Sequence, residues 1–413
     1  MGKNEIVTGL DIGTTKICAL IAEISDSGEA TIIGSGISPS VGMIRGVVVD
    51  IDATAKAIEE AIAAASKQAN VEVDGVYVGV TGEHIASLNS QGIIPITRPD
   101  REITQEDVTR VNEQSRVIVL PPDRQIVHAI PRVYTVDGQS GITKPVGMSG
   151  TRLSVETHIV HGAVTFLQNI EKCVTKAGHD VIEEVLEPIA SGEAVLLPTE
   201  RASGVCLVDI GGGTCDIAVF YEGEIYYTAV VPIGGNHVTN DVAEGLKVGR
   251  EEAERLKTQS GSAVLDLVVE EDVITLHQIG RDEERKLRRR ALVQIIQPRM
   301  QEMFEMIRDE LARADCLDKI PFGIVISGGG SQLRDCAAVA QQTLGLPVRI
   351  GKPHGVGGMG DSLEHPRFAT AVGLIKFAVK QRSMESQIEK NRKPAKVFGL
   401  RALWAKFLEM LGV

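Results

Sequence analysis

A short motif that occurs in both halves of this chain constrains its fold more than any other feature. Residues 11–16 read DIGTTK and residues 209–214 read DIGGGT, and each motif lies between two apolar runs. Glycine and threonine in that position are typical of the tip of a tight β-hairpin. Glycine lets the backbone approach an anion closely, and hairpin N–H groups and threonine hydroxyls can donate to phosphate oxygens. Two such hairpins in equivalent half-chains predict a clamp around a nucleotide triphosphate.

The elements predicted around the two motifs follow the same order. Three strands surround each motif, at 6–10, 17–24 and 31–38 in the first half and at 205–209, 215–221 and 225–231 in the second. Further elements follow in both halves: a helix at 52–69 and a strand at 76–80, and later a strand at 322–326 and a helix at 332–344. This order predicts two α/β lobes with mixed sheets, and the nucleotide would lie in the cleft between them.

Length, charge and cysteine content narrow the class of protein. The chain has 413 residues, enough for two large lobes, and its net charge of −12 argues against general binding to nucleic acid. Its six cysteines contain no C-x-x-C pair, so we expect core residues in a reducing compartment and not a metal site or disulfide framework. No signal peptide and no apolar run of membrane-spanning length is evident, which predicts a cytoplasmic protein.

The paired hairpins resemble the two phosphate loops of the actin-like ATPase superfamily, which includes actin, heat-shock chaperone ATPases and sugar kinases. The resemblance implies an α/β, actin-like fold, made of a duplicated ribonuclease-H-like unit, that binds ATP and Mg²⁺. Asp11 and Asp209 would hold the Mg²⁺ ion through water. The implied phosphate contacts are Gly13, Thr14, Thr15, Lys16, Gly211, Gly212, Gly213 and Thr214.

Three further segments resemble the adenosine-binding parts of that superfamily. A glycine run at 327–331 follows an apolar strand, and its bare backbone would let a flat purine or ribose pack against it. A turn at 234–236 would face the cleft. Glu254 and Lys257 share one face of a predicted helix because they are three residues apart. The implied adenosine contacts are Gly234, Gly235, Asn236, Glu254, Lys257, Gly328, Gly329, Gly330 and Ser331.

Residues 187–192 resemble the segment that connects the two lobes in this superfamily, where one residue often orients the attacking water. Pro188 makes the preceding backbone extended, so Glu187 would end a strand at the floor of the cleft. Glu187 is therefore the candidate catalytic residue. The alternative is a solvated acid in a cluster with Glu183 and Glu184. The resemblance implies ATP binding and at most a weak ATPase.

Two other motifs are interpreted as structural. Gly355, Gly357 and Gly360 match the spacing of a dinucleotide fingerprint, but no strand precedes them, so we expect a loop. His158 and His161 have a metal-like spacing, but they would point to opposite faces of a strand. The sequence also lacks the G-x-x-x-x-G-K-[ST] motif, which excludes a P-loop NTPase.

The C-terminal segment predicts an amphipathic helix after a polar linker at 381–396. Most apolar side chains between residues 397 and 411 fall within an arc of roughly 160° on a helical wheel. This helix would be about 22 Å long, shorter than a hydrocarbon core of roughly 30 Å, so we expect it to lie flat at an anionic membrane surface. The alternative is docking on the protein's own core or on a partner protein. The expected membrane contacts are Val397, Leu400, Arg401, Leu403, Trp404, Lys406, Phe407, Leu408 and Leu411.

An actin-like core without a substrate-binding domain, followed by this helix, resembles the FtsA family of bacterial cell-division proteins. Segments 38–46, 144–150 and 355–359 add to the resemblance, which covers essentially the whole chain. It implies an adaptor that binds ATP, polymerises, and tethers FtsZ filaments to the inner face of the cytoplasmic membrane. Such a peripheral protein would act at the division septum and recruit later division proteins.

The same resemblance implies a partner site and a division into subdomains. The FtsZ tail would bind Arg285, Arg288, Arg289 and Arg299, whereas the alternative for this basic run is a solvated helix face. The segment 84–160 would be an extra subdomain with a helix near 104–117, and the alternative is a neutral insertion. The implied parts are the first-lobe core (1–83, 161–195 and 362–380), the insert (84–160), the second-lobe core (196–226 and 300–361), the outer subdomain (227–299), the linker (381–396) and the amphipathic helix (397–413).

Two other functions are compatible with such a core. A PilM-like pilus-assembly protein shares it but gives the terminal helix no role. A metabolic kinase of the sugar-kinase branch would need a catalytic aspartate in an inserted substrate domain, and the sequence offers no convincing candidate. Binding to an FtsZ tail or to a pilus-protein peptide would separate the first two hypotheses.

Overall fold

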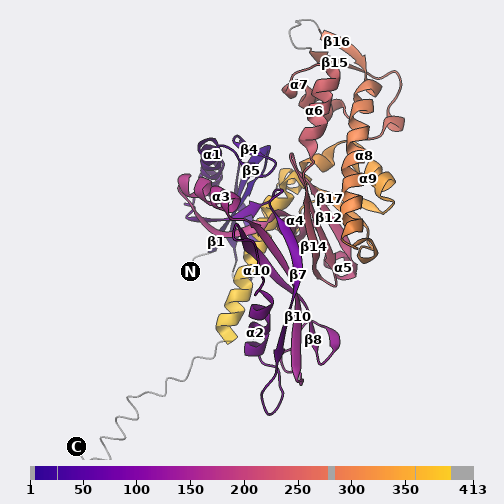
Figure 1. Ribbon diagram of the computed structural model, residues 1–413. Coiled ribbons are helices and arrows are strands. Elements are labelled where there is room, and N and C mark those ends of the chain that lie inside the picture. The colour runs from indigo at the N-terminus through magenta and orange to yellow at the C-terminus, as the bar shows by residue number, and fades with distance from the viewer. Residues whose placement is uncertain (1–4, 26, 278–283, 359, 392–413) are drawn as a thin grey trace, which may run out of the picture.

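The computed structural model describes residues 5–25, 27–277, 284–358 and 360–391, and shows two lobes with a third unit attached (Figure 1). The first lobe is built on a five-stranded sheet in the order β11-β6-β1-β2-β3. Strands β1, β2 and β3 form an antiparallel meander, while β6 joins β1 in parallel and β11 joins β6 in parallel. The strands are β1 (Glu5–Ile12), β2 (Lys16–Ile24), β3 (Ala30–Pro39), β6 (Gly75–Val80) and β11 (Asp180–Leu186).

Helices bury both faces of this first sheet. Alternate side chains of β2 enter different hydrophobic clusters, because successive residues of a strand point to opposite faces. Ile17 and Ile21 pack with α1 and α3, whereas Cys18 and Leu20 pack with α4 and α10. The covering helices are α1 (Ile51–Ala69), α3 (Val164–Lys176), α4 (Glu187–Val195) and α10 (Ala369–Asn391).

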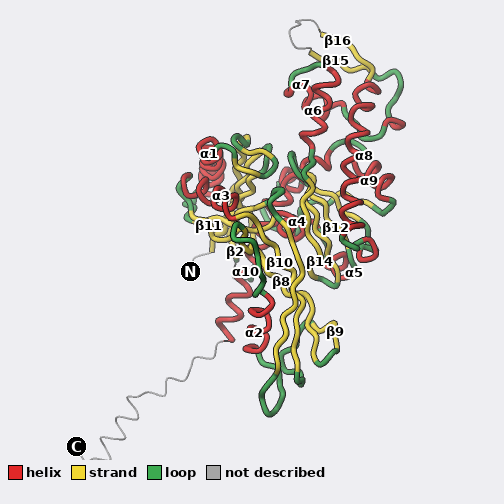
Figure 2. Tube along the Cα trace, viewed as in Figure 1, coloured by secondary structure: helices red, strands yellow, loops and turns green. Residues whose placement is uncertain are grey.

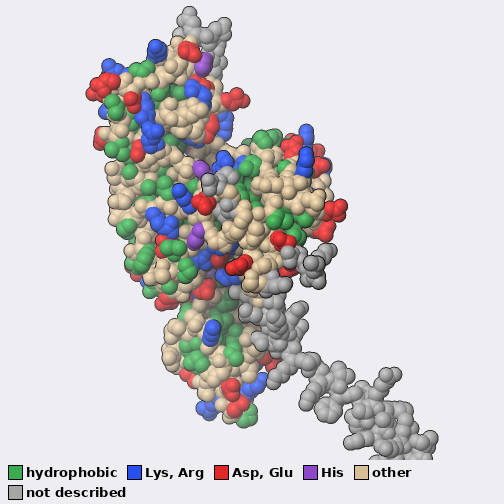
Figure 3. Space-filling view, turned by 180° about the vertical axis from the view of Figure 1, so that it is seen from behind, with side chains coloured by type: hydrophobic (Ala, Val, Ile, Leu, Met, Phe, Trp, Pro, Cys, Tyr) green, Lys and Arg blue, Asp and Glu red, His purple; other side chains and the backbone are tan. Residues whose placement is uncertain are grey.

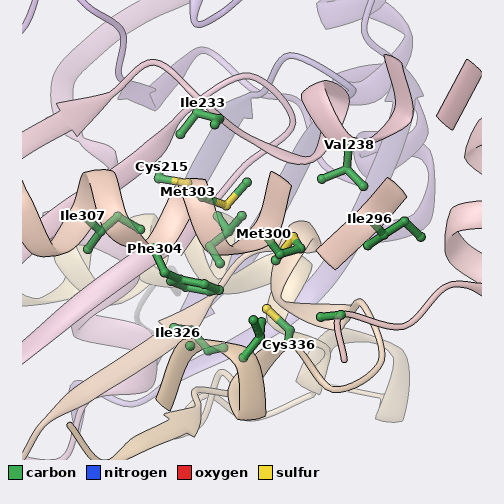
Figure 4. Close-up of a cluster of buried hydrophobic side chains, with 14 of the residues drawn as sticks. Cys215, Ile233, Val238, Ile296, Met300, Met303, Phe304, Ile307, Ile326 and Cys336 are labelled. Carbon is green, nitrogen blue, oxygen red and sulfur yellow. The ribbon is translucent and has the colours of Figure 1, made fainter. Parts of the chain in front are cut away.

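The second lobe repeats the strand order of the first. Its sheet runs β18-β17-β12-β13-β14, so β12, β13 and β14 correspond to β1, β2 and β3. One face packs on α6, α8 and α9 through a large aliphatic cluster that includes Met300, Met303 and Phe304 (Figure 4). The elements are α5 (Pro198–Ser203), β12 (Val205–Ile210), β13 (Cys215–Tyr221), β14 (Glu224–Val231), α6 (Gly235–Leu246), α7 (Arg250–Ser260), β15 (Val273–His277), β16 (Glu284–Arg288), α8 (Arg289–Arg313), β17 (Ile324–Ser327), α9 (Cys336–Leu344) and β18 (Val348–Ile350).

The third unit is a separate four-stranded sheet in the order β7-β10-β8-β9 with one helix on it. Its strands also contact β14 of the second lobe, beside which they run in Figure 2. Thr104 precedes the first residue of the helix, and its backbone N–H and its hydroxyl both donate to the carboxylate of Asp107 in the first turn. The elements are β7 (Ala86–Pro95), α2 (Gln105–Ser115), β8 (Arg124–Val136), β9 (Gln139–Ile142) and β10 (Arg152–Ala163).

One predicted helix start was wrong, and one segment predicted as a linker is partly helical. The helix predicted from residue 332 begins only at Cys336, after a 3₁₀ turn at Gly329–Gln332. A continuous helix is excluded there because Asp335 has a left-handed backbone with φ of 62°. The polar linker predicted from residue 381 is helical at its start, since α10 continues to Asn391.

The described part of the chain contains no helix that combines the length and the hydropathy needed to cross a bilayer. The predicted amphipathic helix at 397–413 lies outside the described residues.

Candidate functional site

The two sequence motifs form the same β-hairpin turn. In the first, the N–H of Gly13 donates to the carbonyl of Lys16 at 3.0 Å, and in the second the N–H of Gly211 donates to the carbonyl of Thr214 at 2.9 Å. The cross-strand register is also the same, since Asp11 lies opposite Cys18 and Asp209 opposite Asp216. The duplication predicted from the motifs is therefore confirmed at the level of individual backbone hydrogen bonds.

The hairpin tips approach each other across the interface between the lobes. A Cβ atom on Gly212 would lie 2.5 Å from Cγ2 of Thr15, so the second tip has no room for a side chain facing the first. The backbone of α6 supports this tip from behind, because the N–H groups of Gly235 and Asn236 donate to the carbonyls of Gly211 and Gly212 at 3.0 and 2.8 Å.

A polar cavity of about 290 Å³ lies between the tips. Both acidic and basic side chains line its walls, and Lys16 is paired with Asp11 at 2.8 Å. Backbone N–H groups and hydroxyls near a lysine make such a cavity suitable for phosphate groups. Its lining comprises Asp11, Gly13, Thr14, Thr15, Lys16, Thr81, Glu187, Asp209, Gly211, Gly212, Thr214, Gly328, Gly329, Pro366, Arg367 and Thr370.

The acids that line this cavity, and Asp216 behind its wall, are crowded and buried. Burial raises the pKa of Asp209 to about 6, against the hydrogen bond that Ser191 donates to it at 2.5 Å. Burial also raises the pKa of Asp216 to about 7, although Thr81 donates to its carboxylate and stabilises the charge. The charge of Asp209 adds to the increase at Asp216.

Glu187 lies at the floor of the cavity, at the first position of α4 directly after β11. Burial, together with repulsion by neighbouring aspartates, raises the pKa of Glu187 well above its usual range. Its Oε1 atom is buried without a hydrogen-bond partner, and only 8% of the residue is exposed. The alternative of a solvated surface acid is therefore wrong for Glu187.

A hydrated divalent cation fits this group of carboxylates. Burial is the main cause of the raised pKa values, and neighbouring carboxylates add to them, so ionising the whole group without a counter-cation is costly although one lysine is paired here. Among the described residues, no three acidic, histidine or cysteine side chains converge closely enough to bind a metal on their own. Mg²⁺ usually keeps several waters and takes one or two carboxylates plus phosphate oxygens, which suits Asp11 and Asp209.

A second, more apolar cavity of about 250 Å³ adjoins the first and shares Thr15, Gly211, Gly212 and Gly329 with it. Glu254 and Lys257 of α7 form an ion pair at 2.7 Å on one wall, as their spacing suggested. Methionine side chains of α8 line it, and Figure 4 shows them projecting from that helix. The cavity is lined by Thr15, Ile210, Gly211, Gly212, Gly235, Asn236, Val238, Glu254, Lys257, Thr258, Met300, Met303, Gly329, Gly330, Gln332 and Leu333.

Three predicted site residues support the cavities without lining either one. Gly234 packs on the second hairpin, where its Cβ atom would lie 2.7 Å from the carbonyl oxygen of Gly211. Gly213 faces Arg45, and the buried hydroxyl of Ser331 donates to the carbonyl of Gly328 at 2.8 Å. The remaining predicted phosphate, adenosine and metal residues line one of the two cavities.

Sequence reasoning missed several residues of the site. Asp216 carried a usable signal, because it stands two residues after the second hairpin tip, directly across the strand pair from Asp209. Thr81, Arg367 and Met300 carried none, since they follow ordinary strand, turn and helix patterns and reach the site only through the tertiary fold.

The arginines predicted for the FtsZ tail lie at the outer end of the second lobe but differ in exposure. Arg285 and Arg288 of β16 are exposed. Arg289 bonds to the carbonyl of Ser260 and pairs with Asp272, and Arg299 pairs with Asp241 at 2.5 Å. In Figure 3, basic and acidic side chains are interspersed over this end of the molecule.

The two structural predictions for glycine and histidine motifs hold in the described residues. The segment around Gly355 and Gly357 is a loop with a single bridge from Gly357 to Thr31. His158 is buried in β10 and bonds to Asn89 at 2.8 Å and to Thr228 at 3.0 Å, while His161 accepts from Arg124 at 2.6 Å.

Solved structures share this architecture. The chain is similar to the PilM–PilN type IV pilus biogenesis complex, with a TM-score of 0.63, 17% identity, and coverage of 90% of this chain and 98% of the other. MreB5 of Spiroplasma citri bound to ADP gives a TM-score of 0.55 at 14% identity, with 93% and 98% of the chains covered. At such low identity these likenesses show the fold alone, which is the actin-like ATPase fold with an inserted subdomain.

Sequence comparison is more specific. Residues 206–373 match the family model described as cell division protein FtsA, and residues 82–161 match the model of the SHS2 domain inserted in FtsA. The chain is 40% identical to cell division protein FtsA of Pseudomonas aeruginosa over 92% of its length and 90% of that protein. It is 35% identical to FtsA of Escherichia coli strain K12, with 94% of both chains covered. The chain therefore belongs to the FtsA family of cell-division proteins.

Proposed function

We propose that this chain is an ATP-binding, actin-like adaptor that polymerises and tethers FtsZ filaments to the inner face of the cytoplasmic membrane at the division septum. It would also recruit later division proteins. The main support is the cavity between the two phosphate hairpins. It adjoins a more apolar cavity whose size and lining suit adenosine, and the chain belongs to the FtsA family.

Different site residues would bind the phosphates, the ribose and base, and the Mg²⁺ ion. N–H groups of the hairpin tips, the hydroxyls of Thr14 and Thr15 and the ammonium group of Lys16 would bind phosphate oxygens. Glu254 and Lys257 would contact the ribose and base from α7. Bound Mg²⁺ would neutralise charge between the phosphates and the carboxylates of Asp11 and Asp209.

The proposed catalytic role of Glu187 is to orient an attacking water. It can accept a hydrogen bond from water well only when ionised, and its raised pKa opposes ionisation in the buried site. This supports at most slow ATP hydrolysis. Nucleotide held by both hairpins would instead fix the angle between the lobes, and with it the surfaces available for polymerisation.

The proposed membrane contact is the amphipathic helix predicted at 397–411, beyond the described residues. Near its start, α10 contributes Thr370 to the phosphate cavity, and the helix then leads away to Asn391. One copy of a short amphipathic helix binds a membrane weakly, so a polymer of many copies would bind far better through effective concentration.

The proposed contact with an acidic FtsZ tail is best supported at Arg285 and Arg288, which are exposed. Arg288 would leave a long contact with Glu270 at 3.9 Å, whereas Arg289 and Arg299 would need to exchange closer acidic partners for those of the tail. Exposed arginines also steer an oppositely charged peptide toward the surface.

Co-sedimentation of the full chain with anionic vesicles tests the membrane contact. We expect Trp404→Glu to abolish sedimentation, because a charge in the centre of the apolar face opposes insertion, and to leave ATP binding intact. Val119→Glu is the matched control, since Val119 is fully exposed on a loop of the insert. Unchanged sedimentation of the Trp404 variant would contradict the proposal.

A further inference from the structure

A two-residue turn lies over the junction of the two phosphate hairpins. Strands β4 (Met43–Ile44) and β5 (Val47–Val48) pair with Met43 opposite Val48 and Ile44 opposite Val47, which leaves Arg45 and Gly46 at the tip. Both tip residues have a positive φ, 48° and 77°. A turn of this kind favours Asn-Gly, since few side chains tolerate a left-handed backbone. An arginine at its first position therefore suggests that its side chain has a use.

The backbone of this tip touches both phosphate hairpins. The N–H of Gly46 donates to Oγ1 of Thr14 at 3.3 Å in the first hairpin. In the second hairpin, a Cβ atom on Gly213 would lie 2.8 Å from Cα of Arg45. The tip thus lies within one arginine side-chain length of any group that the glycine-rich second hairpin binds.

The tip also marks one end of the phosphate cavity. A Cβ atom on Gly46 would lie 3.0 Å from the carbonyl oxygen of Thr81, and Thr81 lines the phosphate cavity but not the adjoining apolar cavity. The ribose and base would lie at the opposite end, beside Glu254 and Lys257. The phosphate nearest Arg45 would therefore be the terminal one.

In the present structure the guanidinium group of Arg45 points to Glu83, with Nη1 at 3.5 Å from Oε1. Both side chains are half exposed, at 51% and 50%. A long, exposed ion pair of this kind contributes little stability, so it is easily exchanged. A phosphate oxygen close to the protein would compete well for the guanidinium, because arginine binds phosphate with charge-assisted, often bidentate hydrogen bonds.

We propose that Arg45 leaves Glu83 and binds the terminal phosphate of a bound nucleoside triphosphate, so that this turn distinguishes triphosphate from diphosphate. The inference rests on the proposed nucleotide binding and adds a residue that reads the state of the nucleotide. Glu83 competes with the phosphate for the same guanidinium. The tip touches the hairpins of both lobes. The contact between Arg45 and the terminal phosphate would therefore form at the interface between the lobes, and only when a triphosphate is bound.

Titration calorimetry of the full chain with MgATP and MgADP tests the proposal. The variant Arg45→Asn removes the guanidinium and keeps a residue that suits the turn, so its melting temperature should not fall. Its affinity for MgATP should decrease about 10- to 100-fold, the loss expected for a charge-assisted hydrogen bond, while its affinity for MgADP stays within about twofold. The matched control is Arg98→Asn, which removes an equally exposed arginine paired with Glu106 on the insert.

A second variant tests the competition. Glu83→Gln frees the guanidinium of Arg45 and should increase MgATP affinity about threefold, with MgADP affinity unchanged. Equal affinities of wild type and Arg45→Asn for MgATP would overturn the inference, as would an equal loss for both nucleotides. In either case the wild type still binds nucleotide and the proposed function stands. Absence of binding by the wild type would instead contradict the proposed function, and this inference with it.

Discussion

At the scale of single residues, the most unusual feature is a group of carboxyl side chains that are buried, where the charged form is disfavoured. Asp209, Asp216 and Glu187 are buried next to one another, and each has a raised pKa. Asp11 and Lys16 face the same cavity as a pair. Burial and, to a lesser extent, mutual repulsion therefore make it costly to ionise these carboxyl groups, and a cation bound beside them would lower that cost.

This predicts that the buried carboxyl groups lower the stability of the nucleotide-free protein as the pH rises. A carboxyl whose pKa is higher in the folded state binds more protons folded than unfolded, so the free energy of unfolding falls through that window. The histidines with lowered pKa values act in the opposite direction up to about pH 7.5, because unfolded histidine still binds protons there: the pKa values of His84, His128 and His158 are lowered to about 4, 4 and 3, and those of His161 and His365 are lowered as well. The histidine contribution cancels when the wild type is compared with Asp216→Asn. Relative to that variant, the wild type should lose about 1–3 kcal/mol of unfolding free energy between pH 5.5 and 8, measured by urea denaturation.

Asp216→Asn should flatten this pH dependence, because it removes one titrating group and lowers the repulsion on the others. Asp309→Asn provides the control, since Asp309 is an exposed acid of α8 and should leave the slope unchanged. If the unfolding free energy of the wild type relative to Asp216→Asn stays level or rises from pH 5.5 to 8, the carboxylate cluster does not destabilise the protein as described.

The sequence was informative about residues in the hairpins and weak about the residues that meet them. Asp11, Lys16 and Asp209 belong to a local motif whose geometry follows from strand pairing, so their place could be predicted. Arg367 and Thr81 reach the same cavity from turns and strands far away along the chain, and no local pattern marks them.

At the scale of elements, the start of α6 supports the second phosphate hairpin from behind. Gly234→Ala would place a Cβ atom 2.7 Å from the carbonyl oxygen of Gly211, which is backbone and cannot rotate away. We expect the free energy of unfolding to fall by about 1–3 kcal/mol, and MgATP and MgADP affinity to fall alike. Melting curves and calorimetry would measure both changes.

Gly249→Ala is a closely matched control for that variant. Gly249 also precedes a helix, α7, and a Cβ atom there would meet nothing within 4 Å. It should leave stability and nucleotide affinity unchanged. Equal behaviour of the two alanine variants would show that α6 does not shape the site.

The insert is held against the second lobe by a polar contact. His158 of β10 bonds to the hydroxyl of Thr228 on β14 at 3.0 Å, and Ser87 of β7 donates to the carbonyl of Thr228 at 2.8 Å. Thr228→Val should cost about 1–3 kcal/mol, because it leaves a buried imidazole nitrogen without a partner. It should also speed hydrogen exchange in β7 and β10.

Thr135→Val on the open face of the insert's sheet should change neither quantity. Unaltered stability and exchange in the Thr228 variant would mean that this contact does not hold the insert. The contact itself could not be predicted, because it joins segments 70 residues apart whose pairing depends on how the insert folds back.

Element bounds were predicted well where strand and helix periodicity was strong and less well near backbone irregularities. The meander strands and the helix at Ile51–Ala69 agree with the sequence patterns to within one or two residues. The start of α9 was missed because Asp335 adopts a left-handed backbone that its side chain does not reveal.

At the scale of the whole molecule, the two lobes share one continuous core. The inner faces of both sheets pack on α4 and α10 in a single hydrophobic cluster. These two helices touch so closely that a Cβ atom on Gly373 would lie 1.9 Å from the carbonyl oxygen of Ala190. The two lobes are thus joined by a close contact between α4 and α10, and one nucleotide would bind to a hairpin of each lobe. This arrangement suits a molecule in which nucleotide binding sets the angle between the lobes.

The central claim is that this protein joins FtsZ to a membrane, and the most direct test is recruitment of a labelled FtsZ tail peptide to vesicles that carry the full chain. With or without MgATP, the peptide should bind only to vesicles that carry the protein. Binding should be stronger with MgATP, because polymerisation raises the effective concentration of tail sites. No recruitment in either state would contradict the account.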